Sequence, residues 1–169
     1  RQMCIRDRNP YFIDLEELIK KELLTKEECE ACDWGGSESY VDYEKMYLSR
    51  YKLLRKAYEK ADLKTNPDYA EFLKEEKDWL QDYCLFMAIK NDQKGICWID
   101  WPEELKDRHS KAVKEAEKEL AEEIEFYRFQ QYCFTTQWRK LKAYANKKDI
   151  SIIGDVPIYV ALDLSLIHI

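Results

Sequence analysis

The sequence predicts an α/β fold to which this chain contributes mostly helices. Hydrophobic residues recur at helical spacing over most of the 169 residues. One continuous run rich in β-branched residues, 150–155, has the composition of a buried parallel strand that is covered on both faces. No second strand pattern is present to pair with it, so we expect the sheet to be completed by residues outside this sequence.

The first part of the sequence predicts an extended stretch followed by two short helices. Residues 9–13 contain an Asn-Pro step, which disfavours helix before the proline and so predicts extended backbone. Asp14 is placed to cap a helix over residues 15–21. Thr25 and Glu28 have the spacing of a capping box, which predicts the start of a second short helix.

Two longer helices are predicted next. A stripe at helical spacing predicts a helix over residues 42–61, and the stripe consists of Tyr43, Met46, Tyr47, Tyr51, Leu54 and Tyr58. Asn66-Pro67 combines an N-cap with a proline at the first helical position. We expect the helix that starts there to break near Lys77-Asp78 and to end at a Lys94-Gly95 turn.

The last third predicts an aromatic segment and one very long helix. Trp98 and Trp101 lie close together, and we favour packing of both rings in the core over stacking on a sugar. Ser110 is expected to open a helix that runs to about Asn146, charged over its first half and apolar almost all round over 126–144. A helix that changes in this way passes from solvent into a core.

The two ends of the sequence resemble one inverted DNA element. Codons exist for residues 164–169 whose reverse complement, read one base later, encodes Met3-Cys4-Ile5-Arg6-Asp7 and the first bases of an arginine codon. This element is similar to the adapter that transposase-based sequencing libraries leave on reads. We therefore expect residues 1–8 and 164–169 to be adapter-derived, and residues 9–163 to be an internal part of a larger gene.

The composition argues against several classes of protein. The formal net charge is −6 and 37% of residues are charged, which does not fit the basic surface of a nucleic-acid-binding protein. No apolar run approaches the roughly 20 residues of a membrane-spanning helix. We therefore expect neither nucleic acid nor membrane as a partner, and a cytoplasmic location.

The cysteine and histidine content limits the chemistry of residues 9–163. His109 is the one histidine in this range, so a two-histidine zinc site or a Ser-His-Asp triad cannot be assembled from it. Cys29 and Cys32 have CxxC spacing but close a short helix and lack a second ligand pair, so a structural or incidental role is favoured. We predict no metal site and no cofactor.

Asp155 is the residue that the pattern marks as a candidate for binding. It follows the predicted strand, and ligands of barrels and open α/β sheets bind beyond the carboxyl ends of the strands. A carboxylate there could contact a substrate, or it could cap a turn through backbone N–H groups. The residues alone leave these two roles equally open.

Six stretches, in this order, carry a resemblance to a known family: NPYFIDLEELI, VDYEKMYLSRYKLLRKAY, DWLQDYCLFMAIK, WIDWPEEL, FYRFQQYCFTTQWRKLKAYA and ISIIGDVPIYVALD. They resemble the 4-α-glucanotransferase family, also called amylomaltase or disproportionating enzyme, and from the first to the last they span residues 9–163. Departures from the family pattern are Thr135-Thr136, which replace bulkier or basic residues, and the cysteines at 84 and 133. After Asp163 the sequence leaves the family pattern, at the junction inferred from the DNA element.

The resemblance implies a (β/α)₈ TIM barrel with a helical insertion subdomain, of which this chain is a mostly helical fragment. It implies transfer of α-1,4-glucan segments between maltodextrins, the maltooligosaccharide substrates, by a retaining mechanism that uses two carboxyl groups. The family's catalytic acids are expected beyond residue 163, so no catalytic residue is assigned here. Asp155, Tyr159 and Asp163 fall in a loop that the resemblance places beside the sugar-binding cleft.

Two other interpretations stay open. The parent protein could be a related α-glucan hydrolase, which would release reducing ends without making longer maltodextrins. Alternatively, the chain could be a small helical interaction protein whose long helix forms a coiled coil. An orphan apolar strand at 150–155 argues against the second interpretation, because an unpaired strand edge promotes aggregation.

Overall fold

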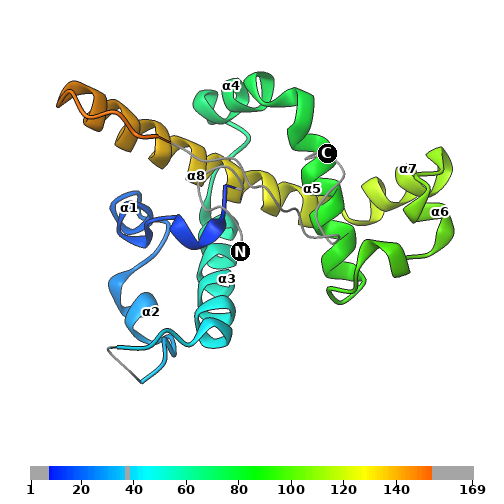
Figure 1. Ribbon diagram of the computed structural model, residues 1–169, viewed down its shortest axis with the longest axis horizontal. Helices are drawn as coiled ribbons and strands as arrows, with labels where there is room; N and C mark the ends of the chain where they lie inside the picture. The colour runs from blue at the N-terminus through cyan, green and yellow to red at the C-terminus, as the bar shows by residue number, and fades with distance from the viewer. Residues whose placement is uncertain (1–7, 37–38, 154–169) are drawn as a thin grey trace. The chain divides into compact units, whose positions relative to one another are not determined.

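The computed structural model of the protein describes residues 8–36 and 39–153 (Figure 1). The elements are η1 (Pro10–Phe12), α1 (Leu15–Lys20), α2 (Lys26–Glu30), α3 (Tyr43–Lys60), α4 (Pro67–Glu75), α5 (Lys77–Asp92), η2 (Trp98–Asp100), α6 (Glu103–Lys106), α7 (Ser110–Glu119) and α8 (Ala121–Lys147). These described residues form two compact units, one of residues 8–36, 39–66 and 130–153, the other of residues 67–129. The division falls within α8, between Phe129 and Gln130.

The first turn of the chain differs from the extended stretch that the sequence predicts. Asn9 is extended, as expected for a residue before proline, but its side chain accepts a hydrogen bond from the backbone N–H of Tyr11 at 2.9 Å. Pro10 then begins the 3₁₀ helix η1, because its fixed φ suits a first helical position. The prediction of extended backbone is therefore confirmed at Asn9 and Ile13 and was wrong over Pro10–Phe12.

The two predicted caps are confirmed. The Asp14 carboxylate accepts from the Glu16 N–H at 2.9 Å and begins α1. At α2, the Thr25 hydroxyl accepts from the Glu28 N–H at 3.2 Å while the Glu28 carboxylate accepts from the Thr25 N–H at 3.0 Å. Each cap satisfies backbone donors that the first turn of a helix leaves unpaired.

The helix α3 has the predicted bounds but buries a different face. Its buried residues are Ser49, Leu53, Leu54 and Ala57. Tyr43 and Tyr47, members of the predicted stripe, are 69% and 41% exposed. Leucine and alanine carry no polar group that burial would desolvate, whereas a buried tyrosine hydroxyl needs a hydrogen-bond partner. Of the stripe that predicts this helix, Leu54 is buried, whereas the tyrosines at its N-terminal end are exposed.

In the second unit, α4 and α5 are separated at Glu76, which confirms the predicted break near Lys77. The helix α5 contributes the buried residues Leu80, Cys84, Leu85, Ala88 and Ile89. It packs against α4 and α7, and α7 also lies beside α6 (Figure 1).

The long helix predicted from Ser110 to Asn146 is instead two helices. Leu120 has φ −102° and ψ 18°, which separates α7 from α8. No glycine or proline marks this break; the bend lets α7 pack on α5 and α6. Tertiary packing has therefore overridden a continuous helical pattern.

The predicted change of character along α8 is confirmed over its middle. Every residue from Phe129 to Thr135 is buried, so this part of the helix is enclosed on all sides. The apolar pattern continues to Tyr144, but Leu141 and Tyr144 are exposed. The predicted buried surface therefore ends before the helix does.

Among the helices that the structure describes, four end in Schellman motifs whose left-handed residue is not glycine. The residues with positive φ at these ends are Glu22 after α1, Lys94 after α5, Arg108 after α6 and Asp149 after α8. After α5, for example, Gly95 N–H donates to Lys90 C=O at 2.8 Å and Lys94 N–H donates to Asn91 C=O at 3.0 Å. The left-handed conformation costs an L-residue free energy, so these four positions carry local strain.

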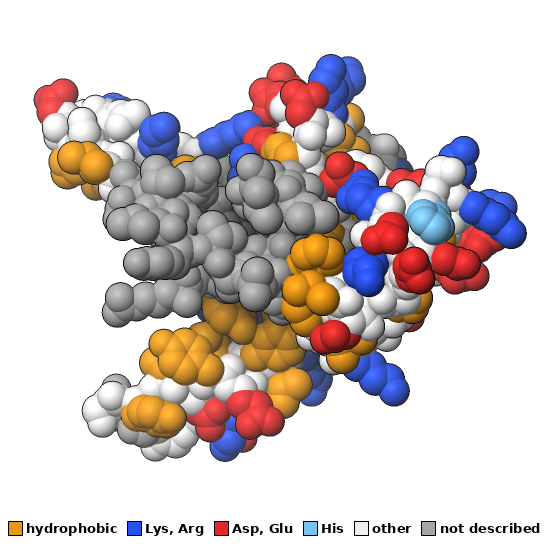
Figure 2. Space-filling model, turned by 45° about the vertical axis from the view of Figure 1, so that its right-hand side comes forward, with side chains coloured by type: hydrophobic (Ala, Val, Ile, Leu, Met, Phe, Trp, Pro, Cys, Tyr) orange, Lys and Arg blue, Asp and Glu red, His pale blue; other side chains and the backbone are white. Residues whose placement is uncertain are grey.

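Surface charge is mixed. Around α6 and α7, lysine and arginine side chains are interspersed with aspartate and glutamate (Figure 2). Among the described residues, no helix combines the length and hydropathy that crossing a lipid bilayer requires.

Candidate functional site

The residues predicted to contact substrate, Asp155, Tyr159 and Asp163, lie outside the described part of the chain. The structure does describe the segment that leads to them. At the end of α8, Asp149 has φ 58° and Ile150 N–H donates to Ala145 C=O at 3.0 Å. This turn sets the direction in which the chain leaves the helix.

The predicted buried strand is not formed over its described residues, 150–153. These residues have no regular secondary structure, and Ile153 is 92% exposed. The physical reason is that a parallel strand needs neighbours to pair its backbone groups, and the described residues contain no strand to supply them. The rest of the run lies outside the described residues.

A groove lies in the first unit between the start of the chain and the C-terminal half of α8. Gln137 joins its two sides with a pair of hydrogen bonds to the backbone of Asp14. The Asp14 N–H donates to Gln137 Oε1 at 2.7 Å, and Gln137 Nε2 donates to the Asp14 C=O at 3.0 Å. A single amide side chain therefore fixes the helix-capping residue of α1 against α8.

The groove is lined by both apolar and polar side chains, and its volume is about 710 Å³. The apolar residues are Phe12, Phe134, Trp138, Leu141 and Tyr144, and the polar ones are Asp14, Glu17, Gln137 and Lys140. A volume of this size falls within the usual range for ligand sites of roughly 300–1,000 Å³. Aromatic faces beside hydrogen-bonding side chains can bind an amphipathic ligand.

The groove can bind but is poorly suited to acid catalysis. Hydrogen bonds from Lys20 and Lys140 lower the pKa of Glu17, so this carboxyl group is ionised at neutral pH. Lys20 Nζ and Lys140 Nζ lie 2.8 Å and 3.3 Å from its oxygens. A general acid needs the opposite, a raised pKa that keeps the proton near neutral pH.

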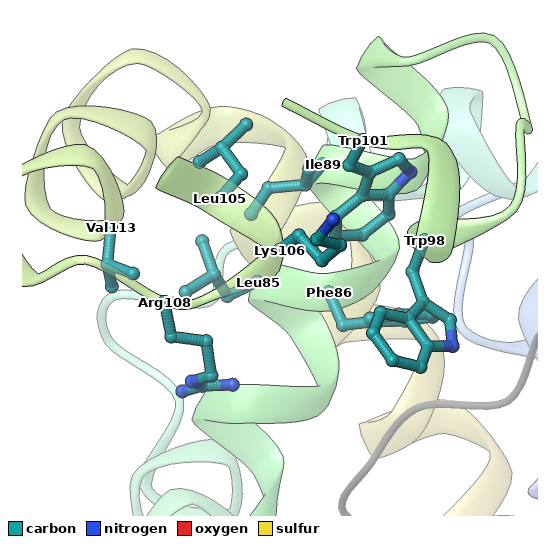
Figure 3. Close-up of a pocket in the computed structure, with 9 residues that line it drawn as sticks. All are labelled: Leu85, Phe86, Ile89, Trp98, Trp101, Leu105, Lys106, Arg108 and Val113. Atoms are coloured by element: carbon teal, nitrogen blue, oxygen red, sulfur yellow. The ribbon is translucent and has the colours of Figure 1, made fainter. Parts of the chain in front are cut away.

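The second unit contains a small aromatic cavity formed by α5, η2, α6 and α7 (Figure 3). The lining residues are Leu85, Phe86, Ile89, Trp98, Trp101, Leu105, Lys106, Arg108 and Val113. Trp101 is buried, its indole N–H donates to Ile96 C=O at 3.3 Å, and its ring lies 5.2 Å from that of Phe86. The predicted core role of Trp101 is therefore confirmed.

This cavity has a volume of only about 40 Å³. That is room for one or two waters but far below the usual ligand-site volume of roughly 300 Å³ or more. The rim residue Arg108 is held by Asp82 at 2.7 Å. The cavity is therefore a packing gap and not a sugar site.

The two buried thiols, Cys84 and Cys133, are weak candidates for nucleophilic chemistry. Burial raises the pKa of Cys84, and burial raises the pKa of Cys133 to about 12, so both stay protonated at neutral pH. Residues 8–36 and 39–153 hold no cluster of three or more His, Cys, Asp or Glu side chains that could bind a metal ion.

Comparison with known proteins identifies the family. The family model for 4-alpha-glucanotransferase matches residues 3–165. The chain belongs to the 4-alpha-glucanotransferase family. Among relatives, a 4-alpha-glucanotransferase from Clostridium butyricum is 43% identical over 93% of this chain, and one from Thermus thermophilus is 41% identical over 92% of it.

A solved structure gives the fold. An amylomaltase from Streptococcus agalactiae in complex with acarbose superposes with a TM-score of 0.84 and 33% identity over 92% of this chain. This confirms the predicted fold class, a mostly helical part of a TIM-barrel enzyme. The chain spans 32% of that structure and 32% of the Clostridium relative's length.

The groove and the Gln137–Asp14 clamp were missed by the sequence interpretation. The sequence offers no signal for the clamp, because Gln137 lies among other polar residues, Thr135, Thr136 and Arg139. Its partner is a backbone segment 123 residues earlier, which no local pattern can indicate.

Proposed function

We propose that this chain is part of a 4-α-glucanotransferase that transfers α-1,4-glucan segments between maltodextrins. The observation that carries the proposal is the family match over residues 3–165, which includes nearly the whole chain. The relatives named 4-alpha-glucanotransferase support it at 40% identity or more over 92% or more of the chain.

The proposed reaction is a retaining double displacement. A nucleophilic carboxylate and an acid/base carboxyl group, about 5–5.5 Å apart, form and then resolve a covalent glycosyl intermediate. In transfer, the acceptor is a sugar hydroxyl in place of water. We place both catalytic carboxyl groups beyond residue 163, so the 169-residue chain alone should be inactive.

We propose Asp155, Tyr159 and Asp163 as the substrate-lining residues that this chain contributes. The support is the family resemblance of the stretch ISIIGDVPIYVALD, which contains all three. Polar side chains at the carboxyl end of a barrel strand lie on the face where ligands bind. The enzyme acts without metal or cofactor, and its location is cytoplasmic.

The experiment is to express the complete reading frame that contains residues 9–163 and to incubate the product with maltotriose. A transferase makes glucose and maltodextrins longer than maltotriose with no net rise in reducing ends. An α-glucan hydrolase raises the reducing ends without longer products, and that result would contradict the proposal. A matched variant is Asp155→Asn, which keeps the side chain's size and removes its charge. For a substrate-lining Asp155 it should weaken maltotriose turnover by at least tenfold.

A further inference from the structure

Cys29 and Cys32 form a close pair of thiols at the end of α2. Cys29 lies in the last turn of the helix, and Cys32 follows the C-cap residue Ala31. Both thiols are free and half-buried, whereas Cys84 and Cys133 are buried. Of the cysteines that the structure describes, these two alone have CxxC spacing.

The backbone holds the pair at a separation that suits a disulfide. The Cys32 N–H donates to the Cys29 C=O at 3.4 Å, which closes a turn over the four residues. Such a turn keeps its end Cα atoms within about 7 Å, and disulfides need about 4.4–6.8 Å. The Cys32 thiol now donates to the Glu28 C=O at 3.5 Å, so its sulfur lies over the last turn of α2.

The same backbone turn holds an aromatic side chain. The Trp34 indole N–H donates to the Cys29 C=O at 2.8 Å. Cys29 and Trp34 also line an open groove of about 710 Å³, together with Leu15, Ile19 and four charged residues. A small thiol reagent can therefore reach Cys29 from the groove, and any change in the turn is transmitted to Trp34.

We propose that Cys29 and Cys32 are a thiol-disulfide switch that exchanges with a low-molecular-weight disulfide such as oxidised glutathione. One protein thiolate attacks a glutathione sulfur, which forms a mixed disulfide and releases one glutathione thiol. The second protein thiolate then attacks the mixed disulfide and releases the second glutathione. Two protein S–H groups are oxidised, and one glutathione disulfide is reduced to two thiols.

In the oxidised form the Cys32 sulfur leaves the Glu28 carbonyl for the Cys29 sulfur. The covalent bond fixes the turn whose carbonyl binds Trp34. The switch thus changes how firmly Trp34 is held at the wall of the groove, while the remainder of α2 keeps its capping box.

The test is peptide mapping of the native full chain after incubation with oxidised glutathione and alkylation of the remaining thiols. The expected result is a Cys29–Cys32 cross-linked peptide, with Cys84 and Cys133 unmodified because the fold protects them. Cys97→Ser, which removes another half-buried thiol, should give the same cross-link. Cys32→Ser should instead retain glutathione on Cys29.

A second readout follows Trp34. Hydrogen exchange of its indole N–H, assigned by comparison with Trp34→Phe, should slow at least threefold in the oxidised chain. Glutathione attached separately to Cys29 and Cys32, or both thiols remaining reduced while Cys97 reacts, would overturn the proposal. Unchanged or faster exchange in the cross-linked chain would overturn the link to Trp34.

Discussion

Replacing Lys94 by glycine should stabilise the second unit, although glycine usually weakens helical proteins. Lys94 has φ 56° at the C-terminal end of α5. In this left-handed conformation the Cβ of an L-residue crowds the following carbonyl oxygen, which costs about 1–2 kcal/mol, and glycine avoids this cost. The greater freedom of glycine in the unfolded chain costs about 0.5–1 kcal/mol. The net expected gain is about 0.5–1 kcal/mol.

Lys74→Gly is the matched control, because Lys74 is exposed within α4 of the same unit. The chemical change and the unfolded-state cost are the same, but no strain is relieved. Lys74→Gly should therefore lose about 1 kcal/mol. Urea unfolding followed by circular dichroism measures both. If Lys94→Gly destabilises the protein as much as Lys74→Gly, the Schellman geometry at α5 is wrong.

Three further predictions concern packing, the groove and pH. Gln137→Ala should lower the free energy of unfolding by about 1–2 kcal/mol, because it removes the two partly solvated hydrogen bonds to the Asp14 backbone. Chemical denaturation measures this change, and an unchanged free energy of unfolding would exclude the Gln137–Asp14 clamp. Val113→Ile should raise stability by up to about 1 kcal/mol by filling the 40 Å³ cavity, and a lower thermal midpoint would show that the gap is absent. Hydrogen bonds, first from the Thr25 backbone and then from Lys60, lower the pKa of Glu28 below its usual value of 4.5. Ionised Glu28 therefore stabilises the folded chain at neutral pH, and this contribution is lost as the pH falls below 4.5. Glu28→Gln should therefore flatten the fall in stability over that acid range in pH-dependent unfolding, and an unchanged slope would contradict this.

Local signals predicted the helix starts well. Asp14 and Thr25 act through hydrogen bonds within three residues, and the break before Lys77 also has a local pattern. The end of α5 was predicted because Lys94-Gly95 contains a glycine. The left-handed residues that end the other helices were not predicted, because a side chain such as that of Glu22 does not indicate a positive φ in a sequence.

Features that depend on distant partners could not be predicted from local patterns. The bend at Leu120 arises where α7 packs on its neighbours, and the buried face of α3 was displaced from the tyrosine stripe. The strand at 150–155 was predicted from composition, but a strand forms only with a partner to pair its backbone. The proposed site residues, Asp155, Tyr159 and Asp163, remain predictions that rest on the family resemblance.

The most direct test of the central claim is to sequence the source DNA outward from residues 9–163 without a transposase step. The proposal predicts that the reading frame extends beyond residues 9–163, and continues past Asp163, into sequence similar to the parts of the relatives that this chain does not cover. It also predicts that the codons for residues 1–8 and 164–169 are absent. A genomic frame that encodes both tails and stops after Ile169 would contradict it, and the chain would then be a small helical protein.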